Sequence, residues 1–391
     1  MVLETIELKD FRNYEKEEVV FHEKINILTG RNAQGKTNLI EAIGLLALGK
    51  SFRTRREQEL VRFGAEEARV KGSLKKKDRP HTTEIHLPSG GSRSPGSSGA
   101  SGAPGASGAS GPSGALGSHG KKSYIVNGVE SGTVADLLGG VYTVVFSPED
   151  LRIVKGDPET RRRFLDRELV LLKPLYYHKL KRYRLALKSR NALLKSERVS
   201  SDLLDIYDEQ LAEAAGAVMA ERAGWLKSLS GAAGEAGSKI TDGAETIAVE
   251  YKPNLSHIGD EYTKEAILEV YSKGRDRDIF VRSTESGPHR DDFSVYASGI
   301  ELRLYGSQGQ QRTAALSLRL AERELIKKET GEDAILLLDD VMSELDPGRQ
   351  ERLLEGFGEN QIFITAAGAF REEALKLRAA KIMRVEAGKI I

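Results

Sequence analysis

The chain reads Gly30-Arg31-Asn32-Ala33-Gln34-Gly35-Lys36-Thr37 directly after a short apolar run, and these residues fit the pattern G-x-x-x-x-G-K-[ST]. The run at 24–29 predicts a strand, and apolar residues at helical spacing after Lys36 predict a helix. A glycine-containing turn between a strand and a helix lets backbone N–H groups hold phosphate oxygens. We therefore predict a phosphate-binding loop at 30–37, in preference to a strand-to-helix turn that binds nothing.

We expect the residues of this loop to have different roles in binding a phosphate. The glycines allow the backbone to approach a ligand closely, and the Lys36 ammonium neutralises terminal phosphates. The Thr37 hydroxyl is expected to ligate Mg²⁺. The predicted nucleotide-binding set of the loop is Gly30, Arg31, Asn32, Ala33, Gln34, Gly35, Lys36 and Thr37.

Two carboxylates follow an apolar run near the other end of the chain. Residues 335–338 predict a buried strand, and Asp339 and Asp340 come directly after it. In a protein with a phosphate loop, the first acid holds Mg²⁺ directly or through water, and the second orients or deprotonates the attacking water. The alternative is that both acids only cap a loop after a core strand. The phosphate loop favours the catalytic interpretation.

A second candidate phosphate element precedes a predicted helix at 311–328. It reads Gly306-Ser307-Gln308-Gly309-Gln310-Gln311-Arg312. The Ser307 hydroxyl and the backbone N–H groups of Gln308, Gly309 and Gln310 can meet a phosphate at a helix N-terminus. A plain turn is the alternative. Two phosphate elements in one chain favour a sandwich dimer, in which the Ser307 loop of one subunit completes the nucleotide site of the other.

Strand and helix signals alternate at both ends of the chain, with helices between them. This order predicts one α/β unit assembled from both termini around a helical insertion. We assign residues 1–150 and 276–391 to the α/β unit and 151–275 to the insertion. Within the insertion, helical spacings predict an antiparallel pair that turns near 196–202, with a helix of about 25 residues spanning roughly 38 Å.

Charge is uneven across this predicted helix pair. Residues 152–198 hold 15 Lys plus Arg against 5 Asp plus Glu, whereas residues 202–250 hold 3 against 10. The basic helix is a candidate contact for a phosphate backbone. The equally weighted alternative is that the two helices attract each other.

Composition excludes several classes of protein. Across 391 residues, 59 Lys plus Arg balance 58 Asp plus Glu, which argues against a purely basic nucleic-acid coat protein. The absence of Cys removes disulfides, thiol catalysis and Cys-ligated zinc. The first residues lack a signal-peptide pattern, and no apolar stretch approaches the ~18 residues of a membrane span. We expect a cytoplasmic protein without membrane contact.

Residues 88–120 are of a different kind, because 30 of these 33 residues are Gly, Ser, Ala or Pro. A Gly recurs at every third position from Gly96 to Gly120. The flanks at 83–87 and 123–128 predict two hairpin strands, so we interpret the segment as a flexible loop in place of a hairpin turn. A collagen-like trimer contact is the alternative.

Taken together, these motifs resemble the RecF family of bacterial recombination-mediator ATPases, which is related to SMC and ABC-type heads. The resemblance covers nearly all of the chain outside 88–120. It rests on the phosphate loop, Phe11-Arg12-Asn13-Tyr14, Phe146–Leu151, Gly156–Pro158, Arg161–Asp166, Gly287–Asp292, Ser307–Arg312 and Leu336–Asp346.

The resemblance implies an ABC/SMC-type ATPase head that binds ATP with Mg²⁺, dimerises around the nucleotide and binds single-stranded or gapped DNA. It implies work with RecO and RecR to place RecA on DNA in repair, replication restart and SOS induction. Lys36 and Asp340 would be catalytic, Thr37 and Asp339 would hold the metal, and Arg12 would lie near the nucleotide. A structural DNA clamp of the SMC kind is the alternative function.

We expect a slow ATPase that DNA stimulates, and two departures from the ABC pattern are consistent with the slow turnover. Residues 146–150 contain no Gln, although ABC ATPases usually reach the Mg²⁺ with one there. Thr365-Ala366-Ala367 stands where these proteins carry a His. The residues alone assign no role to the Gly287–Asp292 stretch, which is either a structural turn or a site.

Overall fold

One antiparallel sheet is built almost entirely from the first third of the chain. Its strand order is β2-β1-β4-β5-β6-β7. The strands are β1 (Val2–Phe11), β2 (Tyr14–Val20), β4 (Glu67–Lys76), β5 (Arg79–Pro88), β6 (Ser123–Val126) and β7 (Val129–Ser131). The computed structural model describes residues 1–89, 121–255, 258–259, 261–342, 347–366 and 380–391. Along β4, buried and exposed residues alternate, because only one face of this sheet packs on the core.

The second sheet combines strands from both ends of the chain, in the order β15-β14-β3-β13-β12-β8. They are β3 (Ile25–Thr29), β8 (Thr143–Phe146), β12 (Ile335–Leu338), β13 (Ile362–Ala366), β14 (Ala380–Glu386) and β15 (Lys389–Ile390). All except β15 run parallel. Every residue of β8 and β12 is buried, as expected for the strands of a parallel sheet covered on both faces.

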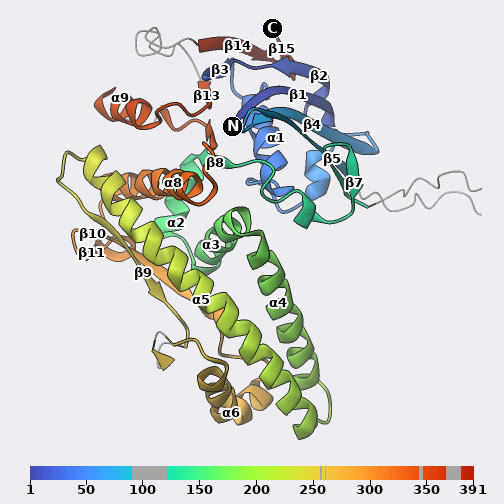
Figure 1. The fold of residues 1–391 in the computed structure, drawn as a ribbon, viewed down its shortest axis with the longest axis vertical. Helices are drawn as coiled ribbons and strands as arrows, with labels where there is room; N and C mark the ends of the chain where they lie inside the picture. Colours follow the sequence, from blue (N-terminus) through green and yellow to red (C-terminus); the bar gives the residue numbers. More distant parts are fainter. Residues whose placement is uncertain (90–120, 256–257, 260, 343–346, 367–379) are drawn as a thin grey trace, which may run out of the picture.

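Helix α1 (Lys36–Leu48) lies between the two sheets (Figure 1). It contacts β1, β4 and β5 on one side and β8 and β13 on the other. Residues 39–47 of this helix are all buried, so the phosphate loop is fixed to the centre of the core. Short 3-10 turns complete this part: η1 (Glu57–Leu60), η2 (Val134–Asp136) and η3 (Pro148–Asp150).

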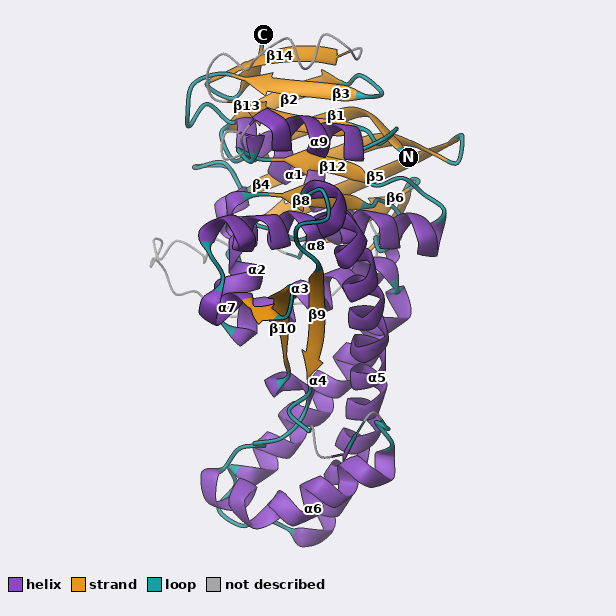
Figure 2. Ribbon diagram, turned by 90° about the vertical axis from the view of Figure 1, so that its left-hand side faces the viewer, coloured by secondary structure: helices purple, strands orange, loops and turns teal. Residues whose placement is uncertain are grey.

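A helical arm extends away from the sheets (Figures 1 and 2). Its helices are α3 (Pro158–Leu172), α4 (Pro174–Leu194), α5 (Ser201–Ile240) and α6 (Lys264–Val281). A small antiparallel sheet lies beside α5, with β9 (Ile247–Lys252), β10 (Asp292–Ala297) and β11 (Ile300–Glu301). The remaining helices are α2 (Leu151–Lys155), α7 (Leu302–Tyr305), α8 (Gln308–Thr330) and α9 (Pro347–Gly356).

The helix starts follow from local sequence. Asp157 accepts a hydrogen bond from the Thr160 N–H at 2.8 Å, and Pro158 begins α3. Ser200 caps α5 in the same way, by accepting from the Leu203 N–H. The turn between α4 and α5 falls at residues 195–200, next to the predicted position.

The predicted assembly of one α/β unit from both termini is confirmed, because β3 and β8 pair with β12, β13 and β14 in one sheet. The expected helix length is wrong. Helix α5 has 40 residues and spans about 60 Å. Its second half contains glycines that lower helix propensity, yet two of them allow close packing on β9. A Cβ on Gly234 would lie 3.2 Å from the Ile247 carbonyl oxygen, and a Cβ on Gly237 would lie 2.6 Å from Ile247 Cγ1.

The opposite charges of α4 and α5 are largely used between the two helices. Lys173 and Lys179 both pair with Glu221, at 2.9 and 2.6 Å, and Arg182 pairs with Glu213 at 2.9 Å. Buried Arg190 pairs with Asp208 at 2.6 Å. Ion pairs with α5 therefore account for part of the positive charge of the basic helix.

The predicted hairpin at the borders of the low-complexity segment is confirmed, since β5 pairs with β6 with His86 opposite Ser123. Residues 90–120 of that segment lie outside the described residues, as do residues 343–346 and Ala367. None of the helices in the described part of the chain is long and apolar enough to span a bilayer.

Candidate nucleotide-binding site

The parallel sheet brings the predicted site residues to one edge. The carboxyl ends of parallel strands lie on the same side of a sheet. The phosphate loop follows β3, Asp339 and Asp340 follow β12, and Thr365 lies at the end of β13 between them. Residues separated by about 300 positions thus become neighbours, as the predicted site requires.

Both glycines of the phosphate loop have positive φ. Gly30 has a φ of 139°, and Gly35, with a φ of 120°, precedes the first turn of α1. The Lys36 side chain is 5% exposed, and its ammonium donates to the Gly30 and Arg31 carbonyls at 2.7 and 2.9 Å. The lysine therefore closes the loop over its own backbone. Arg31, Asn32 and Ala33 are exposed at the rim.

Thr37 and Asp339 meet directly. The Thr37 hydroxyl donates to Asp339 Oδ1 at 2.8 Å, and the Thr365 hydroxyl donates to the same oxygen at 3.0 Å. Burial raises the pKa of Asp339, and the hydrogen bonds from Thr37 and Thr365 oppose that rise. Asp340 is exposed at a φ of 57°, and its N–H donates to Thr365 Oγ1 at 2.9 Å.

Oxygen donors of this kind suit a hard divalent cation. Thr37 and Asp339 supply a hydroxyl and a carboxylate at one point. Within the described residues, no group of three or more His, Asp and Glu side chains gathers as a metal site. A cation held at Thr37 and Asp339 would therefore complete its shell with water and with the oxygens of a bound phosphate.

Arg12 lies beside α1 and is fully engaged there. Its guanidinium makes two hydrogen bonds to buried Glu41, at 2.9 and 2.8 Å, and a third to the Glu59 carbonyl at 2.8 Å. Arg53, which the sequence motifs did not single out, bonds to Asn38 Oδ1 at 2.9 Å in the first turn of α1. Its charge also lowers the pKa of Asp339, more weakly than burial raises it. Only the tertiary fold distinguishes Arg53 from the other basic residues near it.

The Ser307 element lies at the start of α8. Ser307 caps α8, where its Oγ accepts from the Gln310 N–H at 3.2 Å and the Gln310 side chain accepts from the Ser307 N–H at 3.0 Å. Helix α8 packs on α5, α2 and β8, beyond the edge of the parallel sheet. Ser307, Gln308 and Gly309 are exposed. The element is therefore presented outward at a capped helix N-terminus.

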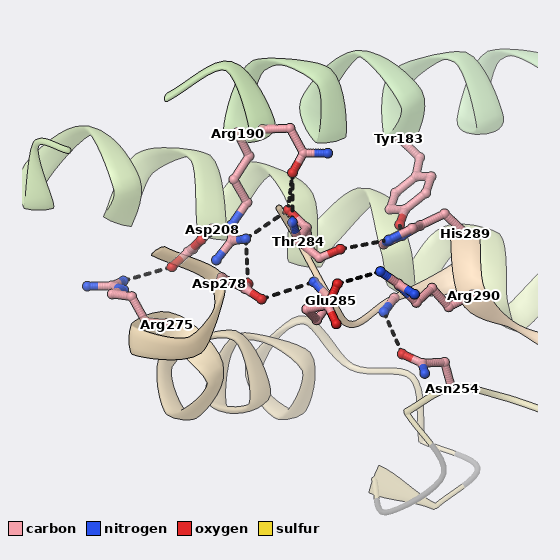
Figure 3. Close-up of polar contacts among 12 residues, drawn as sticks. Tyr183, Arg190, Asp208, Asn254, Arg275, Asp278, Thr284, Glu285, His289 and Arg290 are labelled. Atoms are coloured by element: carbon pink, nitrogen blue, oxygen red, sulfur yellow. Dashed lines mark hydrogen bonds and ion pairs between the residues drawn. The ribbon is translucent and has the colours of Figure 1, made fainter. Parts of the chain in front are cut away.

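The Gly287–Asp292 stretch is a structural junction between the arm and β10 (Figure 3). His289 shares a hydrogen bond with the Tyr183 hydroxyl at 2.6 Å, and burial lowers the pKa of this histidine. Buried Asp291 accepts from Arg222 at 2.9 Å, and Asp292 accepts two bonds from Arg161 at 2.6 and 2.7 Å. These bonds tie α3, α5 and β10 together.

The structure shows which contacts are made at the two positions where the chain departs from the ABC pattern. Ser147 and Asp150 form a capping box after β8, and the second Asp150 oxygen accepts from Arg319 of α8 at 2.6 Å. Thr365 occupies the end of β13 and bridges Asp339 and Asp340. Thr365 is thus a residue of the candidate site. The sequence drew attention to this position only because ABC proteins carry a histidine there.

Known proteins with similar sequences and structures match the chain from end to end. The family model described as RecF/RecN/SMC N terminal domain matches residues 2–89. A DNA replication and repair protein RecF of Clostridioides difficile (strain 630) is 35% identical, with coverage of 100% of this chain and 98% of that protein. The RecF of Bacillus subtilis (strain 168) is 37% identical, with full coverage of both.

Solved structures agree with these relatives. The chain superposes on the recombination mediator protein RecF-ATP in the RecFOR pathway with a TM-score of 0.86 at 33% identity, covering 100% of this chain and 97% of that one. An Smc head domain from Pyrococcus furiosus matches at a TM-score of 0.53 and 16% identity, which shows a shared fold. The fold is therefore that of an ABC/SMC-type ATPase head, and the chain belongs to the RecF family.

Proposed function

We propose that the chain is an ATP-dependent, DNA-binding recombination mediator. In this proposal it dimerises on ATP and, with RecO and RecR, helps load RecA at single-stranded gaps during repair, replication restart and SOS induction. The observation that carries the proposal is the 2.8 Å hydrogen bond between Thr37 and Asp339, because it joins the phosphate loop to the acidic strand in one site. The full-length likeness to RecF with ATP supports the choice of nucleotide.

The nucleotide is held mainly by the loop. Backbone N–H groups of residues 30–37 and the Lys36 ammonium face the phosphates. Thr37 and Asp339 hold Mg²⁺, which supplies charge neutralisation to the phosphate oxygens. Asp340 is the base that orients and deprotonates water, consistent with its exposed position next to Asp339.

Dimerisation places Ser307 of one subunit over the nucleotide of the other. The exposed position of Ser307–Gly309 at the start of α8 supports a role in trans. In the Ser307–Gln310 capping box the Ser307 oxygen only accepts, so its O–H can donate to a phosphate oxygen. ATP thereby closes the dimer, and hydrolysis releases it.

DNA binding is assigned to a lysine stripe on α4. Lys181 and Lys188, with Lys195 at the C-cap of the helix, repeat every seven residues, lie on one face over about 21 Å and are exposed. Among the described residues, none of the three is paired with an acid, in contrast to Lys179 of the same helix and Lys173 directly before it. Unpaired cations at a surface are the groups that release counterions on binding a phosphate backbone.

The stripe is tested by reversing its charge. The variant Lys181→Glu/Lys188→Glu/Lys195→Glu should bind gapped DNA more weakly, and the slope of log affinity against log salt should decrease by about 0.9 per lost phosphate contact. The matched control is Lys227→Glu/Lys239→Glu/Lys328→Glu, which changes net charge equally at exposed lysines of α5 and α8. If both triple variants lose affinity equally, the contact is not on α4.

The overall function is tested by steady-state ATP hydrolysis without DNA, with duplex DNA and with gapped DNA, with Lys36→Ala as the blank. Slow hydrolysis that gapped DNA increases is the expected result. Hydrolysis that no DNA changes would remove the link to recombination and leave only an ATPase.

A structural clamp that tethers DNA is the second candidate, favoured by the shared fold with Smc heads. RecA filament assembly on gapped DNA coated with single-strand-binding protein separates the two functions. A mediator accelerates filament formation in the presence of RecO and RecR, whereas a tether holds two DNA molecules together and leaves the filament rate unchanged.

A further inference from the structure

Two turns from opposite ends of the chain hold the back of the phosphate loop. Asn13 ends the turn between β1 and β2, and Tyr14 is the first residue of β2; these two residues are called the first turn here. The last turn consists of Ala387 and Gly388, between β14 and β15. Neither turn has a role in the nucleotide site described above, yet both bind Gln34 of the loop, and the first turn also binds Gly35.

The first turn binds two consecutive carbonyls. Asn13 Nδ2 donates to the Gln34 carbonyl at 2.9 Å, and the Tyr14 hydroxyl donates to the Gly35 carbonyl at 3.0 Å. Burial raises the pKa of Tyr14, so its hydroxyl stays protonated and remains a donor. A Cβ on Gly35 would lie 2.8 Å from Asn13 Nδ2, which shows how closely the first turn packs on the loop.

The last turn binds the same carbonyl from another direction. The Gly388 N–H donates to the Gln34 carbonyl at 2.9 Å, and the Ala387 N–H donates to the Gln34 side-chain oxygen at 2.7 Å. A Cβ on Gly388 would lie 2.2 Å from the Asn13 carbonyl oxygen. The two turns therefore touch each other as well as the loop, and both acceptor positions of the Gln34 carbonyl are filled.

Because the peptide group is planar, these contacts to the carbonyls also fix the direction of the backbone N–H groups of the loop. In a planar trans peptide, the C=O of one residue and the N–H of the next point in opposite directions. Fixing the Gln34 and Gly35 carbonyls toward the turns directs the N–H groups of Gly35 and Lys36 to the opposite side. These N–H groups belong to the glycine-lysine step that cradles phosphate in loops of this pattern.

The loop needs such support because its backbone is strained. Ala33 has a φ of 62°, a left-handed conformation that a residue with a Cβ adopts at a cost. Without external contacts, the segment would relax to other conformations, and a ligand would have to order it on binding. A loop that is already held loses less entropy when phosphate arrives.

We propose that Asn13, Tyr14 and the Ala387–Gly388 turn are positioning residues, which hold the phosphate loop in its binding conformation before nucleotide is present. This inference rests on the proposed nucleotide site. It makes the last hairpin of the chain part of that site, although its residues touch the loop only from behind.

The test uses three hairpin turns of the same shape. Gly388 has a φ of 76° after Ala387 at 49°, Gly128 has 81° after Asn127 at 51°, and Gly299 has 84° after Ser298 at 47°. Each substitution by Ala therefore introduces the same backbone strain, but a Cβ on Gly128 or Gly299 meets nothing within 4 Å. Only Gly388→Ala pushes a turn away from Asn13 and the loop.

We expect Gly388→Ala to weaken Mg·ATP binding about tenfold by calorimetry. The KM for ATP should rise by a similar factor with kcat retained, and the melting temperature without nucleotide should fall no more than in Gly128→Ala and Gly299→Ala. Equal ATP affinity in the three variants would overturn the proposal. If the wild-type chain itself does not bind Mg·ATP, the proposed nucleotide site is wrong, which is a different outcome.

A second pair of variants covers the case in which Gly388→Ala does not fold. Asn13→Ala removes the donor to the Gln34 carbonyl and should also raise the dissociation constant for ATP about tenfold. Asn360→Ala is its control, because Asn360 donates to the Ala334 carbonyl at 2.7 Å, at the opposite end of β12. If both substitutions change stability and neither changes ATP affinity, the first turn does not position the loop.

Discussion

At the scale of single residues, Thr365 explains how two adjacent carboxylates acquire different environments. Its hydroxyl donates to Asp339 and accepts from the N–H of Asp340, so one side chain fixes both positions. Asp339 is turned into the site beside Thr37, whereas Asp340 is turned outward at a positive φ. These two orientations are what the proposed roles require, with Asp339 at the metal and Asp340 at the attacking water.

The role of Asp340 is tested by Asp340→Asn. Asn tolerates the left-handed backbone at this position, so the change removes the charge without altering the turn. We expect ATP binding and the ATP-dependent dimer to persist while single-turnover hydrolysis falls by about 10²- to 10⁴-fold. Light scattering after ATP addition follows the dimer. Normal turnover in this variant would reject Asp340 as the base.

At the scale of helices, α8 carries both the Ser307 element at its start and a buried ion cluster in its middle. Arg319 contacts Asp150 at 2.6 Å, Glu168 of α3 at 3.4 Å and Glu322 at 2.6 Å. The helix is therefore tied to the turn after β8 and to the arm at once. Any movement of the Ser307 element has to be accommodated by this cluster.

The contact in trans is tested by Ser307→Arg. A bulky side chain at the exposed helix start should spare ATP binding and prevent the ATP-dependent dimer. The substitution also removes a helix cap, at a cost of about 1 kcal/mol. Ser200→Arg serves as the control, since it removes the cap of α5 elsewhere in the molecule. If Ser307→Arg loses ATP binding, or dimerises normally by light scattering, the role in trans is wrong.

The buried cluster predicts a pH dependence of stability. Burial and the adjacent Glu168 raise the pKa of Glu322 well above 4.5, because two packed carboxylates resist ionising together. The folded state therefore binds this proton more tightly than the unfolded state. Its stabilising contribution is complete below the unfolded pKa and decreases as pH rises through the folded value, at up to about 1.4 kcal/mol per pH unit.

Substitution of Glu322 by Gln isolates this contribution. Glu322→Gln keeps the shape of the protonated carboxyl and removes its titration. We expect the free energy of unfolding of the wild-type chain to fall relative to Glu322→Gln as pH rises, measured by urea denaturation between about pH 5 and 8. Parallel curves over this range would show that Glu322 is ionised in the folded chain.

At the scale of the whole molecule, the sequence was sufficient to predict those features that depend on a local pattern of residues. The strand, turn and helix around residues 30–37, the strand before Asp339 and the cap at Asp157 are each contained within a few residues, and each is confirmed. The assembly of both termini into one sheet followed from the order of those elements.

What depends on distant partners was not predictable in the same way. The sequence left open whether the basic helix faces DNA or α5, because the answer depends on which basic side chains meet Glu221 and Glu213. The Gly287–Asp292 stretch became a junction only through Arg161, Tyr183 and Arg222, which lie more than 60 residues away. Helix α5 extends through several glycines, of which Gly234 and Gly237 pack on β9.

The low-complexity segment at residues 88–120 contains none of the sequence motifs that identify the family. Its removal tests whether the rest of the molecule depends on it. The borders of the segment are already adjacent, because β5 and β6 pair with His86 opposite Ser123. The paired strands belong to the antiparallel sheet, while the phosphate loop and both carboxylates lie on the parallel sheet. Deletion of residues 91–118 should therefore shift ATP hydrolysis and gapped-DNA affinity less than about twofold, within the range of surface changes. A marked loss of either, with the melting temperature unchanged, would show that the segment contributes to function directly.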